Sequence, residues 1–92
     1  MAVMKKVFHS DPGHGWLAVK LSDLKMLGIE TQITPYSYVK GKTVYLEEDC
    51  DMARFMSAAK DKGIDVEVRS GPPRDRSPIR YFESYQVDKV NS

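Results

Sequence analysis

The sequence predicts an α+β domain in which an antiparallel sheet of four to six strands carries one main helix packed on one face. Two segments lead to this fold class. Residues 51–62 place Met, Phe, Met and Ala at helical spacing (i, i+3, i+4, i+7), which gives that helix one apolar face. Residues 64–68 alternate apolar and acidic side chains strictly, as a half-buried strand does. The predicted order of elements is β-β-α-β-β-α-β, with or without another strand at the end.

The first part of the chain predicts a hairpin followed by a short helix. Residues 4–10 and 16–19 are its arms, and Asp-Pro-Gly-His-Gly at 11–15 connects them, because proline fixes φ and glycine permits positive φ. Residues 21–28 predict a helix of one to two turns, with Ser22 as the N-cap whose hydroxyl accepts a bond from an unpaired backbone N–H. A helix this short is stable only when it packs against the sheet.

The middle and the end of the chain predict a second hairpin and a last strand. Residues 32–47 are rich in β-branched and aromatic residues and turn at Gly41. Residues 79–85 are expected to add a strand or to dock on a partner. We expect residues 1–85 to form a single domain, which suits a chain of 92 residues, and residues 86–92 to form a flexible tail.

The apolar face of the main helix is expected to cover the sheet. This face is formed by Met52, Phe55, Met56 and Ala59. The strands are expected to meet it with the residues Val7, Leu17, Val19, Val44, Leu46, Val66 and Val68.

Composition and charge exclude several classes of protein. The 14 basic and 13 acidic residues give a net charge of +1, so no global field attracts nucleic acid or an anionic membrane. The single cysteine, Cys50, excludes an intrachain disulfide. Since no apolar run is long enough for a signal peptide or a membrane span, we expect a cytoplasmic protein that does not bind membranes.

His9, Asp11 and His14 form a His-x-Asp-x-x-His pattern across the first predicted turn. Imidazole and carboxylate are ligands for zinc and other divalent metals, so a metal-dependent hydrolase is one alternative. The opposing interpretation is that Asp11 supplies a turn hydrogen bond and that both histidines lie on the surface. We favour it, because a one-residue change in strand phase would place the two imidazoles on opposite faces. We therefore expect no catalytic residue, no metal and no cofactor.

Acidic residues gather at 47–51, directly before the main helix. Carboxylates are favourable there because the N-terminus of a helix carries a partial positive charge. The same run would suit a cation or an arginine-rich partner, but the helix accounts for it without a further function. Cys50 has no histidine nearby in the sequence, so a nucleophilic role is unsupported.

Arginine and aromatic residues gather between residues 69 and 82, where proline and glycine indicate a loop. The candidate partner-binding residues are Arg69, Arg74, Arg76, Arg80, Tyr81 and Phe82. Arginine and tyrosine are frequent in protein interfaces, and arginine with aromatic rings also suits the phosphates and bases of nucleic acid. The sequence favours binding of a protein complex, with nucleic-acid binding through the loop 69–82 as the alternative. A solvated loop without a function is the third interpretation.

Two segments, VFHSDPGHGWLAV at Val7–Val19 and TVYLEEDCD at Thr43–Asp51, resemble small proteins encoded by bacteriophages and prophages. The resemblance implies a viral accessory protein that acts in the cytoplasm of a bacterial host cell. Many such proteins, among them anti-CRISPR and other anti-defence inhibitors, act by binding and blocking a host component. The resemblance therefore implies a non-enzymatic inhibitor of a host protein complex, without an activity-defining motif.

Overall fold

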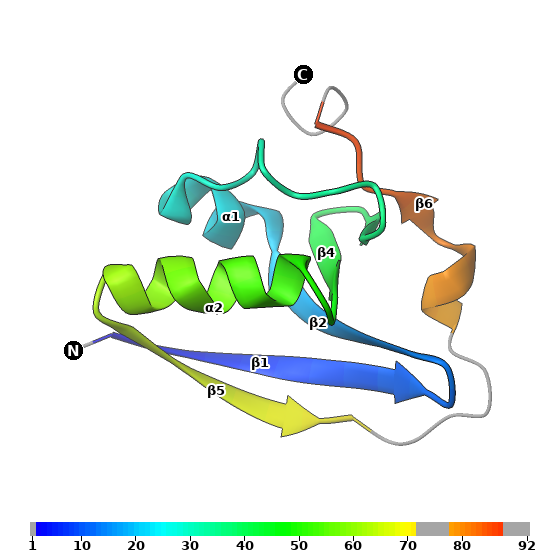
Figure 1. The fold of residues 1–92 in the computed structure, drawn as a ribbon, viewed down its shortest axis with the longest axis horizontal. Coiled ribbons are helices and arrows are strands. Elements are labelled where there is room, and N and C mark those ends of the chain that lie inside the picture. The colour runs from blue at the N-terminus through cyan, green and yellow to red at the C-terminus, as the bar shows by residue number, and fades with distance from the viewer. Residues whose placement is uncertain (1, 72–77, 88–92) are drawn as a thin grey trace.

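The computed structural model describes residues 2–71 and 78–87, with Arg80 described by its backbone alone. Within these residues lie a six-stranded sheet and two α-helices (Figure 1). In chain order the elements are β1 (Ala2–Asp11), β2 (His14–Lys20), α1 (Leu21–Leu27), β3 (Tyr38–Lys40), β4 (Thr43–Glu47), α2 (Asp51–Asp61), β5 (Ile64–Ser70), the 3-10 turn η1 (Pro78–Tyr81) and β6 (Glu83–Ser84). The predicted α+β class and order of elements are confirmed.

The strands follow the spatial order β5-β1-β2-β4-β3-β6, and the sheet is mixed. β5 lies parallel to β1, with Ala2 opposite Ile64 and Phe8 opposite Ser70, whereas the other neighbouring strands are antiparallel. The prediction of an antiparallel sheet is therefore wrong at this edge. The reason is the connection. Since β4 runs in the same direction as β1 and β5, the chain must cross over the sheet, and α2 is that crossover.

Both helices bury their apolar side chains against the same face of the sheet, which we call the helix face. α2 crosses in front of β2 in Figure 1 and contributes Phe55 and Ala59, both fully buried. α1 adds Leu24 and Leu27, so the prediction of one main helix is incomplete. The sheet completes this core with Leu17, Val19, Val44 and Leu46.

Strand phase differs from the prediction in β1. Val7 lies opposite Ala18 and is 37% exposed, whereas Phe8 lies opposite Leu17 and packs against the core. Successive residues of a strand face opposite sides of the sheet, so only one of two adjacent apolar residues can meet the helices. Val7 was wrongly expected in the core, and Phe8 takes its place. Val68, on the edge strand β5, is 43% exposed and also lies largely outside the core.

The ring of Phe8 explains why residue 15 is glycine. A Cβ atom added at Gly15 would lie 2.3 Å from the Cζ atom of Phe8, far inside van der Waals contact. The aromatic ring fills the space above this buried glycine of β2. Gly15 lies in β2 without a positive φ, so its role is close packing against Phe8 and the turn role that the sequence predicted for it is wrong.

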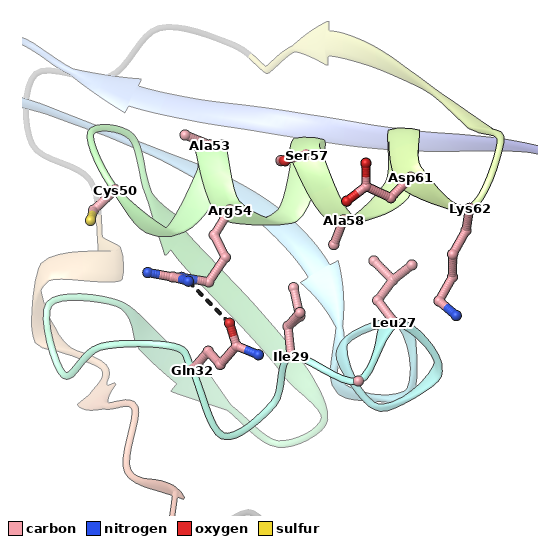
Figure 2. Close-up of a pocket in the computed structure, with 11 residues that line it drawn as sticks. Leu27, Ile29, Gln32, Cys50, Ala53, Arg54, Ser57, Ala58, Asp61 and Lys62 are labelled. Carbon is pink, nitrogen blue, oxygen red and sulfur yellow. Dashed lines mark hydrogen bonds between the residues drawn. The ribbon is translucent and has the colours of Figure 1, made fainter.

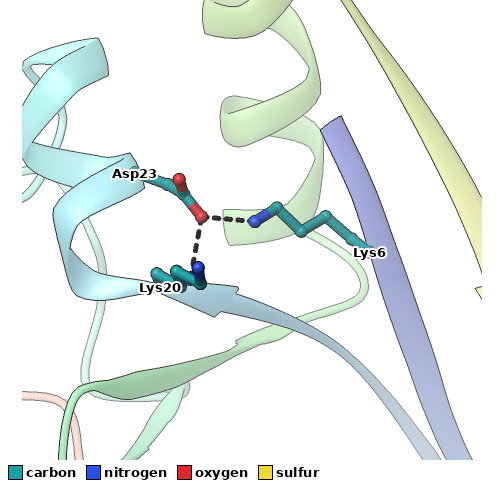
Figure 3. A network of polar contacts seen from close by, with 3 residues as sticks. All are labelled: Lys6, Lys20 and Asp23. Atoms are coloured by element: carbon teal, nitrogen blue, oxygen red, sulfur yellow. Dashed lines mark hydrogen bonds and ion pairs between the residues drawn. The ribbon is translucent and has the colours of Figure 1, made fainter. Parts of the chain in front are cut away.

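α1 begins with a different cap from the one predicted. The carboxylate of Asp23 accepts a hydrogen bond of 3.0 Å from the backbone N–H of Lys20, and it also pairs with the ammonium group of Lys6 (Figure 3). Ser22 was wrongly assigned as the N-cap, because the helix begins one residue before it. Lys6 lies on the helix face of β1, so this ion pair balances a charge that points among apolar neighbours.

The second hairpin and the last strand are shorter than predicted. β3 contains three residues, and residues 28–37 form an irregular segment that buries Ile29 and Ile33. Residues 79–85 contain most of η1 and the two-residue β6, which pairs with β3, instead of one continuous strand. The predicted tail, 86–92, lies outside the described residues from 88 onward.

The strand phase of β1 can be tested by paired substitutions. Phe8→Ala should lower the free energy of unfolding by about 2 to 4 kcal/mol, because it leaves a cavity above Gly15. Val7→Ala, on the other face of the same strand, should cost less than about 1 kcal/mol. Urea denaturation followed by circular dichroism measures both values. Equal losses would contradict the assigned phase.

Candidate functional site

A buried carboxylate holds the irregular segment 28–37 against the first turn of α2. Asp51 is 0% exposed, and its two Oδ atoms accept hydrogen bonds from the backbone N–H of Thr34 at 3.2 and 3.1 Å. Its Oδ2 atom also accepts bonds from the hydroxyl groups of Thr34, at 2.7 Å, and Ser37, at 2.5 Å. The Ser37 Oγ atom in turn accepts the backbone N–H of Glu47 at 3.0 Å. This network joins the segment, the end of β4 and α2.

One residue of the acidic run, Glu47, binds the backbone amides that lead into α2. The carboxylate of Glu47 accepts hydrogen bonds from the backbone N–H groups of Asp49, Cys50 and Asp51, at distances between 2.5 and 3.0 Å. The amide of Asp51 is the first of α2, where an amide has no partner inside the helix, and those of Asp49 and Cys50 directly precede it. Cys50 is exposed and contributes no side-chain cap.

Tyr85 fastens the segment after β6 to the same network. Its backbone N–H donates to the carbonyl oxygen of Ser37 at 2.8 Å, and its hydroxyl donates to the carbonyl oxygen of Glu30 at 2.6 Å. Burial raises the pKa of this hydroxyl from 10.0 to about 12, and the carboxylates of Glu30 and Asp51 add to the rise. The fully buried ring therefore stays uncharged well above the pH at which an exposed tyrosine ionises.

The opposite face of the sheet, which we call the open face, packs against neither α-helix. Side chains alternate along each strand, so this face is formed by the residues between the core positions. Val3 is 52% exposed and Val7 37% exposed there. The paired residues on the open face include His9, Trp16, Ala18, Lys20, Tyr38, Lys40, Thr43, Tyr45 and Arg69.

A row of exposed lysines crosses the open face. Lys20 lies opposite Thr43, and Thr43 lies opposite Lys40. Val7 lies opposite Ala18, so two residues further along the same register Lys5 lies opposite Lys20. Both lysines line one hollow of 240 Å³. Like charges on adjacent strands repel each other, and Glu67 is the acidic neighbour in line with Lys5. An anionic ligand would relieve this repulsion.

Sequence reasoning missed these lysines because they are far apart in the chain. Lys5, Lys20 and Lys40 belong to three strands, and no local pattern connects them. Alternation within each strand does predict which side each one faces, but only the pairing of β1, β2, β4 and β3 aligns them in one row. Knowledge of the strand order was the missing information.

The predicted partner-binding residues are partly assembled at the open face. Arg69 lies opposite Val7 and is exposed, which agrees with a surface role. Tyr81 is 71% exposed in η1, which also contains Arg80. Arg74 and Arg76 lie outside the described residues.

Phe82 anchors the chain after η1 on the open face. Its ring centroid lies 5.2 Å from that of Tyr45, and the ammonium group of Lys40 lies 4.9 Å above its ring. Both contacts use part of the half-buried Phe82 ring. Its predicted binding role stays a prediction.

The two histidines of the metal hypothesis are held by aromatic neighbours. His14 stacks on Trp16 with ring centroids 5.7 Å apart, and His9 makes an edge contact at 6.0 Å with the ring of Tyr45. Asp11 accepts the backbone N–H groups of the turn at 3.1 and 3.0 Å, as the favoured interpretation expects. Among the described residues, no three His, Cys, Asp or Glu side chains gather as a metal site would require.

A groove of 740 Å³ separates α2 from residues 27–32 (Figure 2). The side chains of Arg54 and Gln32 bridge it through a hydrogen bond of 3.0 Å. Cys50 lies at one end, and no histidine lines the groove.

Comparison with protein-family models, with curated proteins and with solved structures found no match to this chain. The helices in the described part of the chain are each too short or too polar to cross a bilayer.

The network around Asp51 predicts a large effect of an isosteric substitution. Asp51→Asn places an amide donor among three donor groups of Thr34 and Ser37, so it should lower the free energy of unfolding by about 2 to 4 kcal/mol. Asp61→Asn, an exposed position at the other end of α2, should change it by less than about 0.5 kcal/mol. Denaturant titration of both variants measures the difference. A mild effect of Asp51→Asn would contradict the structural role of the network.

The raised pKa of Tyr85 predicts a loss of stability at alkaline pH. The unfolded chain releases this proton near pH 10 and the folded chain near pH 12, so the contribution is complete below pH 10 and is lost as the pH rises towards 12. Tyr85→Phe should remove this part of the pH dependence and also lose the bond to Glu30. Unfolding curves of both proteins between pH 8 and roughly 12 measure the difference. Parallel pH profiles would refute the assignment.

Proposed function

We propose that this protein is a non-enzymatic viral inhibitor that blocks a host protein complex by covering an acidic surface of that complex with its open face. The observation that carries the proposal is the exposed row of Lys5, Lys20 and Lys40, with Arg69 on the neighbouring row. Positive charges placed side by side weaken folding, and an acidic partner reverses that cost.

Two further features support a protein as the partner. Tyr81 projects from η1 beside the anchored Phe82, and exposed tyrosines are frequent at the centre of protein interfaces. Trp16 is 2% exposed, so its ring offers no stacking surface for bases, and the half-buried ring of Phe82 already contacts Tyr45 and Lys40. The net charge of +1 also provides no general attraction to a polyanion.

The resemblance of Val7–Val19 and Thr43–Asp51 to phage proteins supports the viral part of the proposal. An anti-CRISPR or another anti-defence inhibitor is the class of protein that it suggests. A sheet fixed by its own core is already organised for binding, so a blocking protein of this kind loses little entropy when it docks.

Nucleic-acid binding is the second candidate function, and the same lysine row favours it. Three lysines in line across a sheet suit a phosphate backbone. Affinity carried by phosphates falls steeply as salt rises, because counterions are released on binding. Salt dependence therefore separates the two functions.

Charge reversal on the open face tests the proposal. Tagged protein should capture a specific complex from nuclease-treated bacterial lysate, and Lys5→Glu/Lys20→Glu should reduce recovery by about tenfold or more. Lys60→Glu/Lys62→Glu is the matched control on two exposed lysines at the end of α2 and should recover the complex as the native protein does.

Two outcomes contradict the proposed function. Equal recovery by the open-face variant and the native protein would exclude the open face as the docking surface. Binding of DNA or RNA oligonucleotides at low salt, with a steep salt dependence and loss in the same variant, would establish the second candidate instead.

A further inference from the structure

A second hollow, of 390 Å³, lies away from the lysine row, where the β1–β2 turn meets residues 35–36 and 47–49. Its volume is that of a pocket for a small ligand or one side chain. None of the residues of the lysine row lines it. The site is thus separate from the surface of the proposed function.

The charge of this hollow is negative. Among the described residues no lysine or arginine lines it, whereas Glu47, Glu48 and Asp49 do. The carboxylate of Glu47 is engaged by the backbone of the α2 start. Glu48 and Asp49 are exposed, and within the described residues their carboxylates take part in no hydrogen bond or ion pair. Two carboxylates therefore remain for a cationic ligand.

Aromatic side chains also line the hollow, and of these Tyr36, and not the 2% exposed Trp16, offers its ring to a ligand. Trp16 and Tyr38 meet edge to face with ring centroids 6.2 Å apart, and His14 stacks on Trp16. Tyr36 lines the hollow with 77% of its surface exposed. Aromatic faces attract cations, most strongly when carboxylates stand nearby and water is partly excluded.

The two tyrosines are held in place by the buried network. Ser37, between Tyr36 and Tyr38, is fully buried and donates to Asp51. The backbone N–H of Tyr36 also donates to the Thr34 hydroxyl at 3.3 Å. The backbone is therefore held on both sides of Tyr36, so the exposed Tyr36 ring starts from a fixed backbone position.

We propose that this hollow binds the guanidinium group of an arginine side chain presented by a partner protein. Guanidinium is planar and weakly hydrated, so it stacks on aromatic rings and donates two parallel hydrogen bonds to a carboxylate. A lysine ammonium group would gain the charge attraction but not the planar stacking. The inference does not depend on the proposed function of the open face.

N-acetyl-arginine amide is a suitable probe, because the protein has a single tryptophan and that residue lines the hollow. Titration should shift the emission of Trp16 and the NMR amide signals of Glu48 and Asp49, with a dissociation constant in the millimolar range. The citrulline analogue, which has a similar shape and no charge, should leave these signals unchanged. The lysine analogue should bind several-fold more weakly.

Matched variants locate the site. Tyr36→Ala should weaken arginine binding by about threefold or more, and Glu48→Gln/Asp49→Asn should abolish it. Tyr81→Ala, an equally exposed tyrosine that does not line the hollow, should bind as the native protein does.

Three results would overturn the proposal. The first is the absence of NMR shifts at Glu48 and Asp49 with excess arginine. The second is equal binding of the citrulline analogue. The third is unchanged binding by the Tyr36 and carboxylate variants, which substitute exposed residues and should fold normally.

Discussion

The buried carboxylate of Asp51 is the constraint on which most of the structure depends. Within the described residues no basic side chain pairs with it, so hydrogen bonds from Thr34 and Ser37 must compensate for its removal from water. Residues 28–37 have no regular secondary structure, and these bonds therefore determine their path. Tyr85 and Glu47 then complete the network from the segment after β6 and from β4.

This network links folding to both candidate sites. It fixes the start of β3, whose Tyr38 pairs with β4 and β6, and thereby the edge of the open face near Lys40. It also fixes Tyr36 beside the acidic residues before α2. A single buried group thus holds one edge of the basic surface and one side of the acidic, aromatic hollow, although a net charge of +1 suggests neither.

Prediction from the sequence succeeded where the signal is local. The spacing of Phe55 and Ala59 within one helix, and the alternation in β5, depend on neighbours a few residues apart. It failed at Val7 and Phe8, because two adjacent apolar residues are compatible with either strand phase. It also failed to find the row of Lys5 and Lys20, since only strand pairing brings them together.

The sequence by itself determined the α+β class, the order of the elements, the amphipathic α2 and the turn bonds of Asp11, because propensity, periodicity and side-chain-to-backbone bonds act over short distances. The tertiary structure alone decided the parallel pairing of β5 with β1, the burial of Asp51, the lysine row of the open face and the acidic hollow. These features depend on contacts between segments that are distant in the chain. The free energy of such contacts cannot be inferred from a local sequence pattern.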